Sequence, residues 1–353
     1  MNMVSTPRLT SLSHGGGCGC KIAPGVLASL IERSASTTPF AHLLVGAETA
    51  DDAAVYALND EQAVIATTDF FMPIVDDPFD FGRIAAANAL SDVYAMGGTP
   101  LLALAILGMP INVLSTDVIR EILRGGEAIC AQAGIPVAGG HSIDSVEPIY
   151  GLAAIGVVHP RHLKRNSSAC AGDALVVGKP LGVGILSAAL KKERLAESGY
   201  RTLIDTTTRL NVAGPHLAQL PGVHAMTDVT GFGVLGHLLE MCRGAGLSAR
   251  VKMSQIPLLD DVVALAEAGY VTGASVRNWW AYGAQVQLDA RLDNVARSLL
   301  CDPQTSGGLL VACTEDAVPA VIELFHGFGF EHAATIGHMN AATSDSCHVA
   351  VDL

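Results

Sequence analysis

The 353-residue chain is poor in charge, in aromatic side chains and in long apolar runs. Only 16% of its residues are charged and 5% are aromatic, although half are hydrophobic, so the core must consist mainly of aliphatic side chains. The longest apolar stretches, 101–111 and 149–158, contain glycine or proline and fall short of the ~20 residues of a transmembrane helix. Residues 1–12 lack the apolar core of a signal peptide. We expect a soluble, cytoplasmic protein without a membrane partner.

Positive charge is also scarce. The chain has 21 Lys and Arg against 34 Asp and Glu, a formal net charge of −13. Clustered cations supply most of a protein's affinity for nucleic acids, so no nucleic-acid partner is expected. A polyanionic substrate such as ATP would require a divalent cation to offset the repulsion.

Several common motifs are missing. The eight cysteines include no Cys-x-x-Cys pair, and no Cys/His ligand set is evident, so a structural zinc site is not expected. No G-x-x-x-x-G-K-[ST] loop exists, so any ATP site must be of another type. The segment 231–236 matches G-x-G-x-x-G, but the acidic residue expected ~20 positions later is absent, which argues against a Rossmann domain.

Apolar and amphipathic segments alternate along the chain, as is typical of mixed α/β folds. We expect strands at 53–58, 63–68, 101–107, 135–138, 150–158, 174–177, 224–226 and 309–313, and helices at 81–96, 117–133, 183–197, 200–213, 232–242 and 291–300. A basic and polar stretch, 161–168, separates the halves. The pattern predicts a mobile glycine-rich segment, 1–25, followed by two mixed α/β domains, 26–160 and 161–353.

The first candidate site is the segment His14–Lys21, which reads HGGGCGCK. Glycines on both sides should leave Cys18 exposed, and the nearby Lys21 should favour its thiolate. Such a cysteine is suited to nucleophilic or carrier chemistry. A disordered tail whose cysteines have no function is the alternative.

Aspartates at the ends of predicted elements form the second candidate site. Asp51 and Asp52 precede a strand, Asp69 ends one, and Asp228 follows another. Asp92 lies one turn after Asn88 on an alanine-rich helix. Several carboxylates on rigid elements suit Mg²⁺, whereas each one alone could be only a cap or turn residue.

Two loops are less specific. Gly139–Ser142 lies after a predicted strand, where backbone N–H groups could bind a phosphate, and His141 could be structural or catalytic. The polar turn Asp302–Gly308 could be only a connector.

Together these segments resemble the selenophosphate synthetase (selenide, water dikinase) family, within the superfamily of aminoimidazole ribonucleotide synthetase. The resemblance covers essentially the whole chain. Its motifs are HGGGCGCK (14–21), TADDAAV (49–55), TTDFFMP (67–73), AAANALSDVYAMGG (85–98), AGGHSID (138–144), MTDVTGFGVLG (226–236) and CDPQTSGGL (301–309).

The resemblance implies a homodimer whose N-terminal sheets pair into a barrel, and the conversion of ATP, hydrogen selenide and water into selenophosphate, AMP and orthophosphate. It implies catalytic roles for Cys18 and Lys21. It implies Mg²⁺ ligands at Asp52, Asp92 and Asp228. The nucleotide-binding positions that it implies are Lys21, Thr49, Ala50, Asp51, Asp69, Asp92, Gly140, His141 and Ser142.

Two other functions stay open at this point. The chain could be another ATP-dependent synthetase or kinase of the same superfamily, although the Cys18–Lys21 segment has no purpose in such an enzyme. It could instead be a thiol-based selenium or metal carrier that uses Cys18 and Cys20. The carrier hypothesis leaves the aspartates unexplained.

Overall fold

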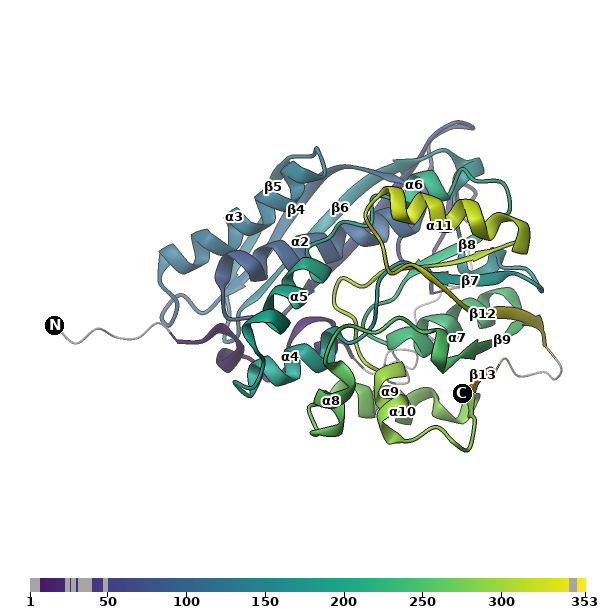
Figure 1. Ribbon diagram of the computed structural model, residues 1–353. Coiled ribbons are helices and arrows are strands. Elements are labelled where there is room, and N and C mark those ends of the chain that lie inside the picture. The colour runs from purple at the N-terminus through teal and green to yellow at the C-terminus, as the bar shows by residue number, and fades with distance from the viewer. Residues whose placement is uncertain (1–6, 23–25, 27–29, 31–39, 47–49, 343–347) are drawn as a thin grey trace.

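A computed structural model describes residues 7–22, 26, 30, 40–46, 50–342 and 348–353 of the chain. Two mixed sheets, each with helices packed on it, lie side by side (Figure 1). This confirms the expected two-domain α/β architecture. Among the described residues, no helix is long and apolar enough to cross a membrane.

The N-terminal sheet has six strands in the order β1-β2-β3-β6-β4-β5. Neighbouring strands are antiparallel except β4 and β5, which are parallel. Among the described residues, helices α2 and α3 pack beside this sheet. The bounds are β1 Leu43–Val45, β2 Ala54–Ala57, β3 Ala63–Phe71, α2 Pro78–Ala95, β4 Thr99–Met109, α3 Thr116–Gln132, β5 Val137–Asp144 and β6 Ile149–Val158.

The C-terminal sheet has seven strands in the order β10-β13-β9-β12-β7-β11-β8. Its strands are β7 Ala174–Val177, β8 Val223–Asp228, β9 Leu247–Lys252, β10 Val286–Leu288, β11 Leu309–Cys313, β12 Ala334–Ala341 and β13 Val349–Asp352. Its helices are α4 Val183–Lys191, α5 Glu197–Thr207, α6 Gly214–Leu217, α7 Gly233–Ala245, α8 Val262–Glu267, α9 Gly273–Tyr282, α10 Asn294–Leu300 and α11 Val318–Gly327.

Helix α2 lies between the two domains and contributes to both. Its start is fixed by Asp77, whose side chain accepts a hydrogen bond from Asp80 N, and by Pro78 at the first helical position. Most of its residues from Phe81 onward are buried, because α2 contacts β3, β6 and α3 on one side and β8 and α5 on the other. A helix that is apolar nearly all round must be buried in this way, so its polar residues Asn88, Ser91 and Asp92 lie inside the protein.

Some predicted boundaries were wrong. The segment Gly139–Ser142 is not a loop, because residues 140–144 pair in parallel with 105–109 and extend β5 to Asp144. The predicted helices 183–197 and 200–213 end earlier, at Lys191 and Thr207. Short strands such as β9 and β13 were not predicted, since their partners are distant in sequence and local pattern does not reveal such pairing.

Helices α2 and α3 pack so closely that a side chain cannot be added between them. A Cβ atom at Gly125 would lie 2.0 Å from the carbonyl oxygen of Phe79. We therefore predict that Gly125→Ala lowers the free energy of unfolding by about 1–3 kcal/mol, because the helices must separate.

The matched control is Gly327→Ala at the end of α11, where an added Cβ meets nothing within 4 Å. This change should leave the free energy of unfolding the same or raise it by up to ~1 kcal/mol, since alanine is the better helix former. Urea denaturation monitored by circular dichroism measures the free energy of unfolding of both variants. Equal effects of the two substitutions would contradict the packing argument.

Candidate active site

Four aspartates from different elements converge on helix α2. Asp69 lies near the end of β3, Asp228 ends β8, Asp92 is on α2, and Asp52 precedes β2. Asp69, Asp92 and Asp228 are buried, with 7%, 8% and 1% of their surfaces exposed. The two sheets and α2 thus bring together carboxylates that are far apart in the sequence.

Burial makes these negative charges costly. It raises the pKa of Asp52 well above its usual value, and the neighbouring Asp228 and Asp92 carboxylates raise it further. Burial and the charges of Asp228 and Asp69 likewise raise the pKa of Asp92, and burial raises that of Asp228. Such a cluster is stable at neutral pH only if cations or protons compensate it.

Two oxygens of these carboxylates have no hydrogen-bond partner among the described residues. Asp52 Oδ1 accepts a hydrogen bond from Thr227 Oγ1 at 2.9 Å, but Asp52 Oδ2 is buried and unsatisfied. Asp228 Oδ2 is also buried and unsatisfied. Unpaired carboxylate oxygens in a buried anionic cluster are the donors that a hard divalent cation prefers, so these residues fit such an ion.

The segment His14–Lys21, called the cysteine segment from here on, contacts this cluster through Lys21 and through Asn88 of α2. Lys21 Nζ and Asn88 Nδ2 both donate to Asp69 Oδ2, at 3.0 and 2.8 Å. The Cys18 thiol donates to Asn88 Oδ1 at 3.1 Å. Burial alone would lower the pKa of Lys21, but the negative charges of Asp69 and Asp92 raise it well above its ordinary value. Lys21 therefore stays protonated beside the carboxylates.

The expectation of an exposed Cys18 thiolate was wrong for this conformation. Cys18 has 1% of its surface exposed, because residues 17–20 form a 3₁₀ turn packed against α2 and the turn Asp302–Gly308. Burial raises the pKa of the Cys18 thiol far above its ordinary value, and the Lys21 charge only partly opposes this. The thiol is therefore neutral here.

The turn Asp302–Gly308 is more than a connector. Thr305 Oγ1 accepts a hydrogen bond from Cys18 N at 3.0 Å, and Ser306 N donates to Asn88 Oδ1 at 2.7 Å. Ser306 holds a left-handed backbone conformation, with φ +52°. Sequence reasoning missed Asn88, Thr305 and Ser306 as residues that position Cys18. No local sequence pattern indicates that the polar turn Asp302–Gly308 is buried.

The remaining predicted nucleotide-binding residues are not all close to this carboxylate cluster. Asp51 Oδ1 accepts a hydrogen bond from Asn166 N at 2.7 Å, and Ala50 O accepts one from Asn166 Nδ2 at 3.0 Å. Thr49 lies outside the described residues. Gly140, His141 and Ser142 are exposed on β5, at the sheet edge and three strand spacings, about 14 Å, from β3. One chain therefore does not bring these three residues to the carboxylates.

One cysteine-containing ligand set was also missed. Ligand atoms of Cys170, Asp173 and His224 lie within 4.8 Å of one another. Asp173 accepts hydrogen bonds from Cys170 N and pairs with His224 Nδ1, both at 2.8 Å. These contacts already satisfy the carboxylate, so they account for the cluster as a structural feature.

Comparison with known proteins identifies the family. Residues 50–158 match the family model of the AIR synthase related protein N-terminal domain, and residues 171–350 match that of the C-terminal domain. A selenide, water dikinase of Burkholderia pseudomallei (strain K96243) is 69% identical over 335 residues, 95% of each chain. Another, of Pseudomonas straminea, is 65% identical over 342 residues, 97% of this chain and 96% of that protein.

The chain belongs to the selenide, water dikinase family. This confirms the resemblance inferred from the motifs. The wider fold is shared with thiamine-monophosphate kinase from Stenotrophomonas maltophilia K279a, at a TM-score of 0.63, 21% identity and coverage of 94% and 96% of the two chains. A chain of a HypE–HypF complex gives a TM-score of 0.66 at 16% identity, with coverage of 93% and 96%. At these identities the likeness shows only the fold.

Gly17 allows Cys18 to pack in the protein interior. Its φ is +52°, and a Cβ atom there would lie 2.2 Å from Thr305 Oγ1 and 2.3 Å from Ile74 Cγ2. We predict that Gly17→Ala displaces the segment, so that iodoacetamide alkylates Cys18 roughly tenfold faster. Peptide mass spectrometry measures the rate for Cys18 alone. Gly327→Ala should leave this rate unchanged, and a wild-type rate in Gly17→Ala would contradict the packing role.

Proposed function

We propose that the chain is a cytoplasmic enzyme that converts ATP, hydrogen selenide and water into selenophosphate, AMP and orthophosphate. The observation that carries the proposal is the placement of Cys18 and Lys21 against a buried cluster of carboxylates. The family assignment supports it, because the relatives are selenide, water dikinases. Neither a carrier protein nor a simple ATPase would need both the Cys18–Lys21 segment and the buried carboxylate cluster.

The charges explain how the site would work. The reaction brings anionic selenide and water to a polyphosphate, so negative charge accumulates in the transition state. Asp52, Asp92 and Asp228 would hold Mg²⁺, which neutralises phosphate charge when bound.

Lys21 and Cys18 would act on the reacting groups. Lys21 is held at Asp69 by a 3.0 Å ion pair, and it would supply a fixed positive charge where phosphate charge develops. Cys18 would orient the selenium nucleophile. The cysteine segment would exclude bulk water and so limit premature hydrolysis of ATP. Thr49, Ala50, Asp51, Asp69 and Asp92 would bind the nucleotide.

Gly140, His141 and Ser142 would complete the nucleotide site of a second subunit, since they are exposed at a sheet edge. The sheet face opposite α2 supports such a homodimer. Phe70 and Leu104 on this face are 48% and 38% exposed, although both lie on inner strands of the sheet. Pairing this face with its copy would bury apolar side chains and close two sheets into a barrel.

The first experiment is anaerobic phosphorus NMR of the protein with Mg·ATP, with and without selenide. We expect selenide-dependent selenophosphate and an equal amount of AMP. Cys18→Ser should abolish selenophosphate formation and leave nucleotide binding within about twofold, because the sulfur lies beside Asn88 rather than among the Asp52, Asp92 and Asp228 carboxylates. Cys170→Ser, at an exposed cysteine, is the control and should behave as wild type.

The outcomes separate the hypotheses. Wild-type selenophosphate yield in Cys18→Ser would contradict the catalytic role of this residue. ATP turnover that selenide does not change would indicate another acceptor within the superfamily. Absence of Mg²⁺-dependent nucleotide binding would favour a carrier.

The dimer makes a separate prediction. Leu104→Glu places a charge on the exposed apolar face of the sheet and should convert the homodimer to a monomer in size-exclusion chromatography with light scattering. Val276→Glu, at a 44% exposed position on α9, is the matched control and should stay dimeric. A monomeric wild type, or a dimeric Leu104→Glu, would refute this interface.

A further inference from the structure

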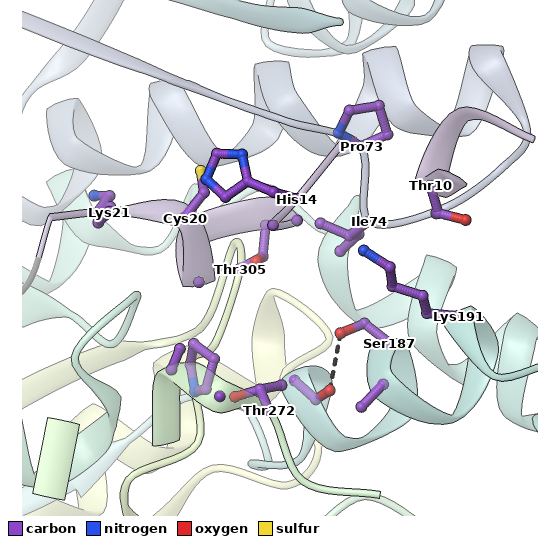
Figure 2. A pocket seen from close by; sticks show the side chains of 18 of the residues that line it. Thr10, His14, Cys20, Lys21, Pro73, Ile74, Ser187, Lys191, Thr272 and Thr305 are labelled. Carbon is purple, nitrogen blue, oxygen red and sulfur yellow. Dashed lines mark hydrogen bonds between the residues drawn. The ribbon is translucent and has the colours of Figure 1, made fainter. Parts of the chain in front are cut away.

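A cavity lies beside the cysteine segment, on the side away from the buried carboxylates. It has a volume of about 580 Å³, within the range of small-molecule sites. Residues 14–16 and 19–22 form one wall, and helices α4 and α9 contribute the opposite wall. Figure 2 shows the amino group of Lys191 pointing from α4 toward the pocket, with Cys20 and Lys21 on the far side.

The lining of this pocket is basic. Its basic residues are His14, Lys21, Lys191, Lys192 and Arg277, and no acidic residue is among the described residues that line it. This is unexpected in a chain with 34 acidic and 21 basic residues. The pocket therefore concentrates positive charge on a protein that is negative overall.

Three of these charges are not neutralised by an ion pair with a described carboxylate. Lys21 is paired with Asp69, and His14 with Glu147. In contrast, Lys191 Nζ donates to Ser13 O at 3.1 Å, and Arg277 donates to Gly19 O at 2.8 Å. The positive charge of Lys191 also helps to lower the pKa of Glu147.

The Lys191 and Arg277 side chains donate hydrogen bonds to carbonyl groups, which carry no net charge to offset theirs, and the Lys192 side chain forms no hydrogen bond to a described residue. Such a field attracts small anions. The buried carboxylates on the other side of the segment repel them. An anionic nucleophile therefore approaches Cys18 more favourably from the basic side.

We propose that this pocket binds the anionic selenium substrate, hydroselenide, next to the cysteine segment. The proposal rests on the proposed function and adds a selenium-binding site to it. Cys20 and Thr305 line the pocket, and Thr305 also accepts the hydrogen bond of Cys18 N. Thr305 thus lies between an anion in the pocket and Cys18, whereas ATP would bind on the carboxylate side.

Lys192 is the most informative position, because its replacement breaks no described hydrogen bond to the segment. We expect Lys192→Gln to raise the KM for selenide about three- to fivefold, with kcat and the KM for ATP unchanged. The double variant Lys191→Gln with Lys192→Gln should raise the KM for selenide roughly tenfold or more. Added salt should raise the KM of the wild type more than that of the double variant, because salt screens the attraction.

Arg120→Gln on α3 is the control, since it removes an exposed charge from a helix that does not line the pocket and should change neither KM. Lys191→Arg keeps the charge and should stay close to wild type, whereas a purely structural role of Lys191 would make it resemble Lys191→Gln. Orthophosphate is the second probe. If the pocket is instead an exit for oxyanion products, the variants will lose inhibition by orthophosphate and keep the KM for selenide.

Two results would overturn the inference while leaving the proposed function intact. One is selenophosphate formation with an unchanged KM for selenide in the double variant. The other is a raised KM for ATP alone, which would make the pocket part of the nucleotide site. Absence of selenophosphate from the wild type would instead refute the proposed function itself.

Discussion

The hydrogen bonds of the Asn88 side chain hold the candidate active site together. Its amide nitrogen donates to Asp69, and its oxygen accepts from Ser306 N and from the Cys18 thiol. One buried amide on α2 thus ties β3, the turn Asp302–Gly308 and the cysteine segment to each other. An amide in a buried position is constrained to satisfy such partners, because an unsatisfied polar group there is costly.

This arrangement depends on the burial of α2 between two domains. The N-terminal sheet supplies Asp69, the C-terminal sheet supplies Asp228, and α2 itself supplies Asp92. Glycines such as Gly125, which have no side chain, let α3 approach α2 closely, and the other side of α2 packs against the second domain. The packing of alanine and glycine therefore determines how near the polar groups come to one another.

Charge is separated across the cysteine segment. Buried carboxylates with raised pKa values lie on one side, and a basic cavity lies on the other. Lys21 belongs to both sides, since its ammonium contacts Asp69 while the residue lines the cavity. A site that must accept a polyphosphate and a second anion has a physical reason for such a division, because two anions repel each other unless separate cations attract them.

The sequence by itself determined the family, the two α/β domains and most of the long elements, because apolar periodicity and the cysteine, aspartate and glycine motifs are local properties. It also singled out Cys18, Lys21 and the aspartates. It led to the wrong environment for Cys18, since flanking glycines suggest exposure while the fold buries the thiol. The same glycine signal suggested a loop at 139–142, where pairing with β4 makes a strand.

Only the tertiary structure decided which groups contact Cys18. Thr305 and Cys18 are 287 residues apart, and Ser306 and Asn88 are 218 apart, so no local pattern links them. The basic cavity likewise joins residues from the N-terminal segment, α4 and α9, and the segment after α4. Such contacts follow from how helices and sheets pack as whole bodies, and that packing depends on the combined shapes of many buried side chains rather than on any single motif.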